Sequence, residues 1–444
     1  MKRRRLTVVA LAFVLAAGAG MLTLAACEAE SESASGPANA PSSSSGAAVA
    51  VAQPMMPEDG AASGEQDLVD EEFAQSLSGF AYRSASAVLG DVGADAGMPA
   101  NGAYSPLSLY YALALANEGA AGTTADQITS ALGAPADVDV AGQCGSLFRA
   151  LVANPDSKVA LANSVWLGKD VPFEQDFVNS AVGQFYATPF SVEFGTAAAD
   201  DALAAWISEN TDGLVNPAIE TDASQILAIV NAIAFKGSWL SPFDEAATQE
   251  DVFHAEGGDV QADFMTQRLN DPQEVRRTDA YLRASLGFGG GASMTFVLPA
   301  EGTSPADLLA DPAALEEAFS APADDLAFVT YTVPKAGFDS SLDLIPALER
   351  LGVREAFTDA ADFSNLSSVS ARISEVKQES HVTWDEEGAE AAAYTNVGIA
   401  KTALAPDAAM EVELRLDRPF LFQITSAQGV PLFVGMCGNP AEAS

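Results

Sequence analysis

The sequence of 444 residues predicts an α+β fold in which helices come mainly early and strands mainly late. Segments with helical spacing of apolar residues come first, and short or alternating apolar runs are more numerous in the second half. The two kinds of segment follow no repeating order, which indicates extensive antiparallel sheet. The sequence shows no internal repeat.

The expected elements can be placed by residue number. Helices are predicted over 67–89, 105–132, 201–210 and 342–351, with Gly119 and Gly122 ending the first part of the second helix. Strands are predicted over 159–167, 225–235, 294–298, 326–334, 372–384, 411–416, 420–425 and 432–435. The glycine-rich stretch 287–293 precedes a strand, whereas a phosphate loop requires a helix there, so we interpret it as a hairpin turn.

Residues 1–26 have the pattern of an export signal. A basic start is followed by an apolar run that stops at Leu24, Ala25 and Ala26, directly before Cys27. This ending resembles the lipobox of bacterial lipoproteins. Cys27 is therefore expected to be lipidated and to anchor the exported protein on the outer face of the cell membrane, in the extracellular space. A plain cleaved signal or a membrane-spanning anchor is the alternative.

Residues 27–66 are expected to form a disordered tether. They are mostly Ser, Ala, Gly, Pro and Glu, and their few large apolar side chains could not offset the entropy lost on ordering. Residues 67–444 contain no comparable linker and no second long apolar run. By length they form one large domain or two tightly joined ones.

Charge restricts the partners of the chain. The formal net charge is −40, and removing the four basic residues of the signal leaves −44. This argues against nucleic acid and heparin-like polyanions as ligands, whereas a cationic partner would be attracted at long range. An acidic surface is just as often a solubility feature.

Few residues could carry catalytic chemistry. The two histidines, His254 and His381, lie in no recognisable catalytic motif, so structural or surface roles are favoured for both. No catalytic residue, metal site or cofactor is predicted. Cys144 and Cys437 could form a disulfide in an exported protein. One is expected in a helix and the other at a strand end, however, with no sign that they meet.

The segment from Asp385 to Pro406 combines a strand pattern with a loop composition. Every second residue from 389 to 399 is small or apolar, so one side of a strand would suit a packed interior. Ala and Glu are poor strand formers, however, and Gly398 and Pro406 are typical of loops. Such a conflict tends to mark a functional site. A solvated, Ala-rich surface loop is the alternative.

Six stretches of the chain resemble the serpin family. They are NGAYSPLSLYYALALANEGAAGTTADQI (101–128), AWISENTDGLVNPAI (205–219), VNAIAFKGSWLSPFD (230–244), VPKAGFDSSLDLIPALERLGVREAF (333–357), DEEGAEAAA (385–393) and RPFLFQITSAQGVPLFVGMCGNP (418–440). Any one of them is a weak signal, but six in the family's order are very specific. The resemblance covers residues 67–444, which would form a single serpin domain.

The resemblance implies a serpin fold, in which three β-sheets are surrounded by about nine helices and an exposed reactive-centre loop is attacked by a target protease. Cleavage would free the loop to insert as a new central strand in the large sheet, with the acylated protease attached. The chain would be a monomeric, secreted endopeptidase inhibitor that forms a covalent complex with a serine protease. It would not be an enzyme, because the protease supplies the chemistry.

The loop would begin with a hinge. The hinge residues are Glu387, Gly388, Ala389, Glu390, Ala391, Ala392 and Ala393. An inserted strand must bury every second side chain, and bulk or charge there would be costly. From 389 to 400 the strand would extend about 40 Å at about 3.3 Å per residue, enough to cross a large sheet. We therefore predict an inhibitor. A non-inhibitory serpin would need a bulky or charged inward hinge residue, and an anchored solute-binding lipoprotein would lack the hinge.

The family's usual spacing from the hinge glycine places the reactive bond between Thr402 and Ala403. A small residue at this position would suit an elastase-like serine protease. Lys401 would imply a trypsin-like target and Leu404 a chymotrypsin-like one. All three stay open, because the segment before Arg418 is longer than in typical members.

Two further sites follow from the resemblance. Ser105, Ser108 and Asn231 match a polar cluster called the shutter, whose hydrogen bonds keep the large sheet closed until insertion. The family often has a His as fourth member, and spacing places Gln378 there, whose amide can also donate and accept. Trp239 matches the breach, the top of the sheet where the loop first enters.

Overall fold

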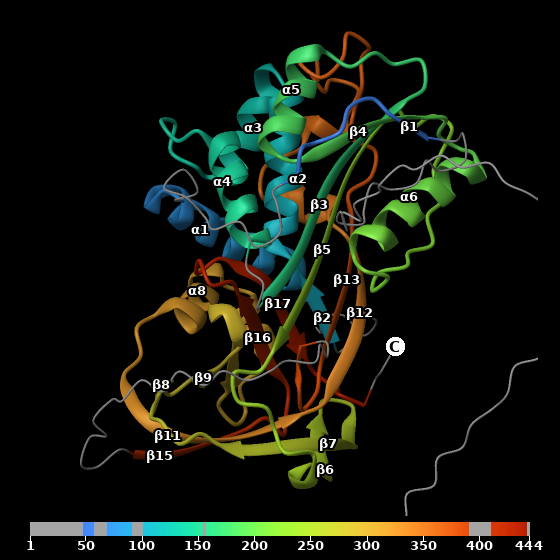
Figure 1. Ribbon diagram of the computed structural model, residues 1–444. Coiled ribbons are helices and arrows are strands. Elements are labelled where there is room, and N and C mark those ends of the chain that lie inside the picture. The colour runs from blue at the N-terminus through green and yellow to red at the C-terminus, as the bar shows by residue number, and fades with distance from the viewer. Residues whose placement is uncertain (1–47, 57–68, 91–100, 154–156, 390–409, 442–444) are drawn as a thin grey trace, which may run out of the picture. The chain divides into compact units, whose positions relative to one another are not determined.

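Nine α-helices occur in the part of the chain that the computed structural model describes, which comprises residues 48–56, 69–90, 101–153, 157–389 and 410–441. They are α1 (Glu71–Leu89), α2 (Pro106–Gly119), α3 (Gly122–Leu132), α4 (Val140–Val152), α5 (Gln175–Gln184), α6 (Ala197–Asn210), α7 (Pro305–Leu309), α8 (Pro312–Ser320) and α9 (Ile345–Arg350). Figure 1 shows α1 to α5 gathered toward one end of the long strands, with α6 apart from them.

The first sheet has seven strands in the order β1-β4-β3-β5-β14-β13-β12. All neighbouring pairs are antiparallel except β3 and β4, which are parallel. The strands are β1 (Ala48–Ala50), β3 (Ser157–Gly168), β4 (Ala187–Val192), β5 (Leu227–Ser238), β12 (Ala336–Asp343), β13 (Lys377–Trp384) and β14 (Gly388–Ala389).

The second sheet has ten strands, in the order β2-β17-β16-β10-β9-β8-β11-β7-β6 with β15 paired to β11. They are β2 (Asn101–Tyr104), β6 (Gln249–Ala255), β7 (Gly258–Arg268), β8 (Gln273–Arg277), β9 (Tyr281–Gly287), β10 (Ser293–Pro299), β11 (Asp325–Pro334), β15 (Met410–Arg415), β16 (Phe420–Thr425) and β17 (Pro431–Cys437). The start of β11 pairs with β8 and its end with β7. Two groups of strands, expected as separate sheets, are therefore joined by hydrogen bonds through β11.

The predicted elements occur with shifted ends. The long second helix is interrupted between Gly119 and Gly122, as expected, and the glycine-rich stretch joins the antiparallel pair β9 and β10 as a hairpin. The last predicted helix is limited to α9, and residues 372–376 precede β13 without being part of it. The α+β class with extensive antiparallel sheet is confirmed.

Helix α2 begins at a well-formed cap. Ser105 caps it through its Oγ, which accepts from the backbone N of Ser108 at 3.2 Å, and Pro106 occupies the first turn, where no intrahelical donor is needed. The helix ends at Gly119, where a Cβ would lie 2.7 Å from the Cβ of Leu366. Most of α2 is buried next to β5 and β17, so the cap brings two serines against the seven-stranded sheet.

Helix α6 packs on the seven-stranded sheet near β3 to β5. Its Ala199 and Leu203 belong to one apolar cluster with Trp166 of β3 and Ala228 of β5. The ring of Trp166 stacks on Phe190 of β4 at 4.2 Å. One cluster thus connects α6 to three adjacent strands.

Part of the predicted tether has structure, which corrects the expectation for residues 27–66. Residues 48–50 form β1 at the edge of the seven-stranded sheet, and the backbone N of Val51 donates to the carbonyl oxygen of Pro189 at 2.8 Å. All residues of this run are Ala or Val, and their exposure alternates, with Ala48 against the α6 cluster and Val49 exposed. Such a run can pair with an open strand edge of the folded sheet. Composition alone does not predict that pairing, because it does not show that such an edge is nearby. The rest of the tether beyond 48–56, like Cys27, lies outside the described residues.

Cys144 in α4 and Cys437 in β17 are buried, free thiols, so the possible disulfide is not formed. Burial raises the pKa of both thiols, which keeps them protonated at neutral pH. Across the described residues, no helix has the length and apolar character needed to cross a membrane.

Candidate functional site

The hinge begins as a two-residue strand between β5 and β13. In β14, Gly388 pairs with Ser238 and Ala389 with Gly237 of β5. Ala389 also pairs with Trp384 of β13. The chain thus enters the seven-stranded sheet, which corresponds to the large sheet of the serpin fold, at the hinge residues expected from the sequence. Of these hinge residues, Glu390 to Ala393 lie outside the described residues.

Gly388 is required for space at this entrance. A Cβ at Gly388 would lie 2.1 Å from the carbonyl oxygen of Gly237 and 2.8 Å from the Cα of Ser238. Its backbone is not among the glycines with positive φ. The reason for a glycine here is therefore the close approach of the neighbouring backbone and not a left-handed conformation.

A narrow cavity of about 10 Å³ lies beside Ala389. Phe235 and Val382 line it from β5 and β13, and Ile424 and Phe433 line it from the second sheet. His381 and Thr383 of β13 complete the lining. Ala389 is 2% exposed, and its burial is what the alternating pattern predicts. The next inward side chains of an inserting strand would meet the same interior, where only small apolar groups fit without cost.

Trp239 fixes the backbone just before the hinge. Its ring Nε1 donates to the carbonyl oxygen of Asp385 at 2.8 Å, and its backbone N donates to that of Glu387 at 2.8 Å. The ring is buried and stacks on Phe288, with centroids 4.4 Å apart and planes at 11°. The residue expected at the breach therefore contacts the entering chain directly.

Glu386 is a buried carboxylate at the same place, and the sequence did not single it out. It is 8% exposed, lies 2.8 Å from the Nζ of Lys335 and accepts from the Oγ1 of Thr248 at 2.7 Å. Burial alone would raise the pKa of Glu386, but the hydrogen bonds from Lys335 and Thr248 outweigh it and lower the pKa. Its backbone is held as well, because its carbonyl oxygen accepts from Phe243 at 2.9 Å.

We expect Glu386→Gln to lower the free energy of unfolding by about 2 kcal/mol near pH 7, because a charge-assisted hydrogen bond is lost. Since the folded-state pKa is lowered, this stabilisation is present above the ordinary value of 4.5 and is lost as pH falls through the folded value. Urea unfolding of both proteins from pH 7 down to pH 3 should show the difference shrinking in acid. Glu387→Gln, at an exposed neighbour, is the control. A difference that stayed constant with pH would contradict the assignment.

The predicted shutter residues meet at the start of α2. The Oγ of Ser108 donates to the Oδ1 of Asn231 in β5, whose Nδ2 donates to the Oδ1 of Asn163 in β3. The Oγ of Ser105 donates to the carbonyl oxygen of Leu432 at 2.7 Å. Asn163, which is 3% exposed, was not predicted.

Gln378 joins this cluster through backbone groups. Its Oε1 accepts from the backbone N of Ser105 at 2.6 Å, and its Nε2 donates to the carbonyl oxygen of the same residue at 2.9 Å. The amide therefore uses both its donor and its acceptor on one residue of the helix cap. Strand β5 is held through Asn231 and β13 through Gln378, each separately attached to the beginning of α2.

A second set of polar contacts lies beside the shutter. Ser340 of β12 and Ser380 of β13 are register partners, and both bind the backbone of Ala103 in β2. The Oγ of Ser340 accepts from the N of Ala103, and the Oγ of Ser380 donates to its carbonyl oxygen, both at 2.9 Å. The sequence could not predict this role for Ser340 and Ser380, because it depends on which strand lies next to β12 and β13 in the fold.

Both histidines form cross-strand contacts with aspartates. His254 Nδ1 lies 2.8 Å from Asp259, its register partner in β7, and His381 Nδ1 lies 2.7 Å from Asp339, its register partner in β12. The hydrogen bond with Asp259, helped by the negative charge of this carboxylate, raises the pKa of His254. These contacts fit the surface roles expected for both. The reactive-bond candidates Lys401, Thr402, Ala403 and Leu404 lie outside the described residues.

Comparison with known sequences agrees with this geometry. Residues 88–440 match the family model described as "Serpin (serine protease inhibitor)". Serpin-ZX of Hordeum vulgare is 32% identical over 386 residues, which cover 81% of this chain and 95% of that protein. Serpin-ZXA of Oryza sativa subsp. japonica is 31% identical over 390 residues, covering 82% and 96%.

Solved structures have the same fold. The thermophilic serpin tengpin in its native state gives a TM-score of 0.74 at 22% identity, covering 88% of this chain and all of that one (100%). Serpin48 of the insect Tenebrio molitor gives a TM-score of 0.70 at 26% identity, covering 83% and 98%. The chain therefore belongs to the serpin family, whose members are generally inhibitors of proteases and not enzymes.

Proposed function

We propose that this serpin is a suicide-substrate inhibitor of serine proteases, which traps the acyl-enzyme by inserting its cleaved loop between β5 and β13. The observation that carries the proposal is the position of β14. Ala389 already lies between the two strands, buried beside a cavity of about 10 Å³ that leaves room only for a small side chain. The alternating small residues that follow in the sequence would continue this strand.

The chemistry comes from the protease. Its serine would attack the carbonyl of Thr402, forming an ester, and the amine of Ala403 would leave as a new chain end. Insertion of the strand would then move the attached protease along the sheet before water hydrolyses the ester. Pairing of the inserted strand with both neighbours supplies the driving force, because it satisfies backbone groups at two strand edges.

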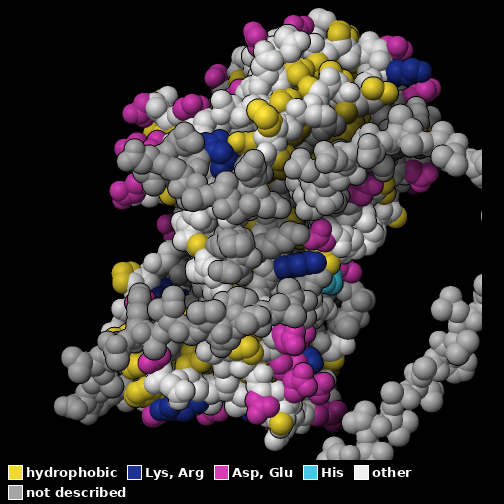
Figure 2. All heavy atoms as spheres, viewed as in Figure 1, with side chains coloured by type: hydrophobic (Ala, Val, Ile, Leu, Met, Phe, Trp, Pro, Cys, Tyr) yellow, Lys and Arg dark blue, Asp and Glu magenta, His cyan; other side chains and the backbone are white. Residues whose placement is uncertain are grey.

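An elastase-like protease is the target we propose, because Thr402 is small. Lys401 and Leu404 specify the trypsin-like and chymotrypsin-like alternatives. Figure 2 shows acidic side chains spread over the drawn face and few basic ones, in keeping with the net charge of −40. A protease with a basic surface would be attracted at long range, more strongly at low salt.

A direct test is to mix the purified protein with elastase-like, trypsin-like and chymotrypsin-like serine proteases. We expect an SDS-stable complex with the combined mass of protease and cleaved serpin, formed fastest with the elastase-like enzyme. Mass spectrometry of the released carboxyl-terminal peptide should show Ala403 as its first residue. Cleavage without complex across the whole panel would reject inhibition and favour a non-inhibitory serpin.

We also propose that the protein acts as a monomer on the outer face of a bacterial cell membrane, anchored through a lipid on Cys27. The support is the sequence pattern of residues 1–27. Replacement of Cys27 by Ser should release the protein from the membrane fraction, and labelling with a radioactive fatty acid should be lost with it. Retention of both in the variant would reject the anchor.

A further inference from the structure

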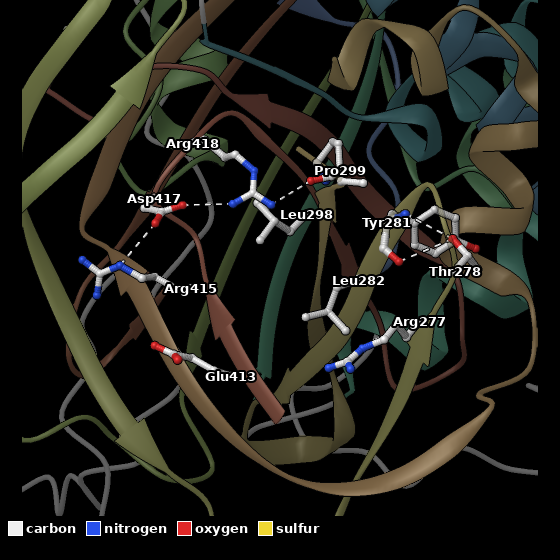
Figure 3. Close-up of a pocket in the computed structure, with 11 residues that line it drawn as sticks. Arg277, Thr278, Tyr281, Leu282, Leu298, Pro299, Glu413, Arg415, Asp417 and Arg418 are labelled. Atoms are coloured by element: carbon white, nitrogen blue, oxygen red, sulfur yellow. Dashed lines mark hydrogen bonds and ion pairs between the residues drawn. The ribbon is translucent and has the colours of Figure 1, made fainter. Parts of the chain in front are cut away.

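A pocket of about 330 Å³ lies at the surface of the ten-stranded sheet and shares no lining residue with the cavity beside the hinge (Figure 3). Its walls come from the turn between β8 and β9, the paired ends of β9 and β10, and β15 with the residues that follow it. One wall of the pocket is β15, the strand that follows the predicted reactive-centre loop in the sequence.

Some charges in this pocket bind one another. Arg415 lies 2.5 Å from Asp251 and 3.3 Å from Asp417. Asp417 also accepts from Arg418 at 3.1 Å, and Arg418 donates to the carbonyl oxygen of Pro299 at 3.0 Å. These contacts, drawn in part in Figure 3, fix the chain after β15 against the end of β10.

Glu413 on β15 differs from the neighbouring outward side chains in its lack of a charged partner among the described residues. The outward side chains of this strand are Glu411, Glu413 and Arg415, which alternate with buried residues. Glu411 binds Arg268 at 2.7 Å, and Arg415 forms ion pairs with Asp251 and Asp417. Glu413, between them, has no hydrogen bond or ion pair to any residue that the structure describes.

Arg277, at the end of β8 on the opposite wall of the pocket, also lacks a charged partner among the described residues. Its guanidinium has no hydrogen bond or ion pair within the described part of the chain, whereas the adjacent Arg276 binds both Glu317 and Asp324 at 2.8 Å. Figure 3 shows Leu282 between Arg277 and Glu413, with no interaction drawn across the gap. Among the described residues, Arg277 and Glu413 are thus a cation and an anion without charged partners on opposite sides of the pocket.

The space between these charges is apolar. Leu298 and Pro299 are buried at the end of β10, and Leu282 stands next to them through the pairing of β9 with β10. A ligand for this pocket needs an anionic end, a cationic end and an apolar body. A zwitterion has no net charge, so the acidic field of the protein does not repel it as it would a simple anion.

We propose that the pocket binds a linear zwitterion of the ω-amino acid class. The carboxylate contacts Arg277, the ammonium group contacts Glu413, and the alkyl chain lies over Leu282. Charge-assisted hydrogen bonds at both ends fix the length of the ligand, so chain length determines affinity.

Ligand binding also strengthens the attachment of β15. The only described strand that pairs with β15 is β11. A ligand held by Glu413 on β15 and by Arg277 on β8 adds a second attachment on the outward face. Because it binds only the folded arrangement, it raises the unfolding temperature of the uncleaved protein.

The test uses the purified full chain and calorimetric titration with glycine, β-alanine, γ-aminobutyrate and ε-aminocaproate. Hexanoate and hexylamine carry one charge each on a similar chain. We expect one zwitterion to bind at least about tenfold more tightly than either singly charged compound, as expected for one charge-assisted contact. The same zwitterion should raise the unfolding temperature. The readout needs no protease, so it is independent of the inhibitory proposal.

Two variants identify the contacts. Arg277→Gln should remove the advantage of the zwitterion over hexylamine, and Glu413→Gln should remove its advantage over hexanoate. Arg354→Gln, which removes another exposed arginine outside the pocket, should leave binding unchanged. Equal binding of zwitterion and hexanoate, no binding by any compound, or undiminished binding in both pocket variants would each overturn the proposal.

Discussion

The Ala389→Arg variant should be cut by the target protease without forming a covalent complex. Ala389 is 2% exposed between β5 and β13, and its side chain faces Phe235 and Val382. An arginine there would have to bury a charge without a partner, at a cost of several kcal/mol. Because Ala389 already occupies this place before cleavage, the arginine would hold the strand out of the entrance. Insertion would slow by about a hundredfold or more, since each 1.4 kcal/mol is a factor of about ten. Hydrolysis of the ester would then be faster than insertion of the loop.

The measurement is the ratio of complex to cleaved serpin on a denaturing gel, together with the moles of serpin needed to inhibit one mole of protease. Ala392→Arg is the matched control, because residue 392 falls on the opposite face of the predicted strand. This control should still form the complex. Undiminished complex with Ala389→Arg would show that the loop does not insert through this entrance.

Gln378→Leu should lower the free energy of unfolding by about 3 kcal/mol. Gln378 is 4% exposed, and its amide satisfies the backbone N of Ser105 at 2.6 Å and its carbonyl oxygen at 2.9 Å. Leucine fills a similar volume but leaves a buried N–H without a partner, which costs about 1–3 kcal/mol in addition to the lost hydrogen bonds. The attachment of β13 to α2 would be weakened at the same time.

Urea unfolding of the uncleaved protein should show the first transition at a lower midpoint. We also expect faster loss of inhibitory activity on storage at moderate heat, because the strands flanking the hinge separate more easily. Gln267→Leu, a strand glutamine with one hydrogen bond to Ser241 at the surface, is the control and should change the midpoint little. Equal midpoints for Gln378→Leu and the wild type would remove Gln378 from the shutter.

Local signals gave much of the fold and part of the site. Gly119 and Gly122 mark the break between α2 and α3, and Ala389, the first residue of the period-2 pattern, is buried as that pattern predicts. Spacing within family motifs brought Gln378 to the right cluster. The atoms that Gln378 binds could not be predicted from the sequence. A side-chain amide can bind any nearby backbone or side-chain group, and the choice depends on three-dimensional distances.

The missed residues have partners far away in the sequence. Glu386 pairs with Lys335 and Thr248, and Asn163 pairs with Asn231 from a neighbouring strand. Such contacts depend on strand order and register, which hydrophobic pattern does not specify. Strand β1 was missed for a related reason, since an exposed sheet edge can order a short segment that is too weak to fold alone.

The pairing of β1 also determines where the first described strand joins the seven-stranded sheet. Through β4 and β3, Ala50 lies in line with Ala228 near the start of β5, whereas the hinge pairs with Gly237 near its end. These points are about 30 Å apart at about 3.3 Å per residue. The described domain therefore begins at the end of this sheet that is remote from the place where the hinge enters it.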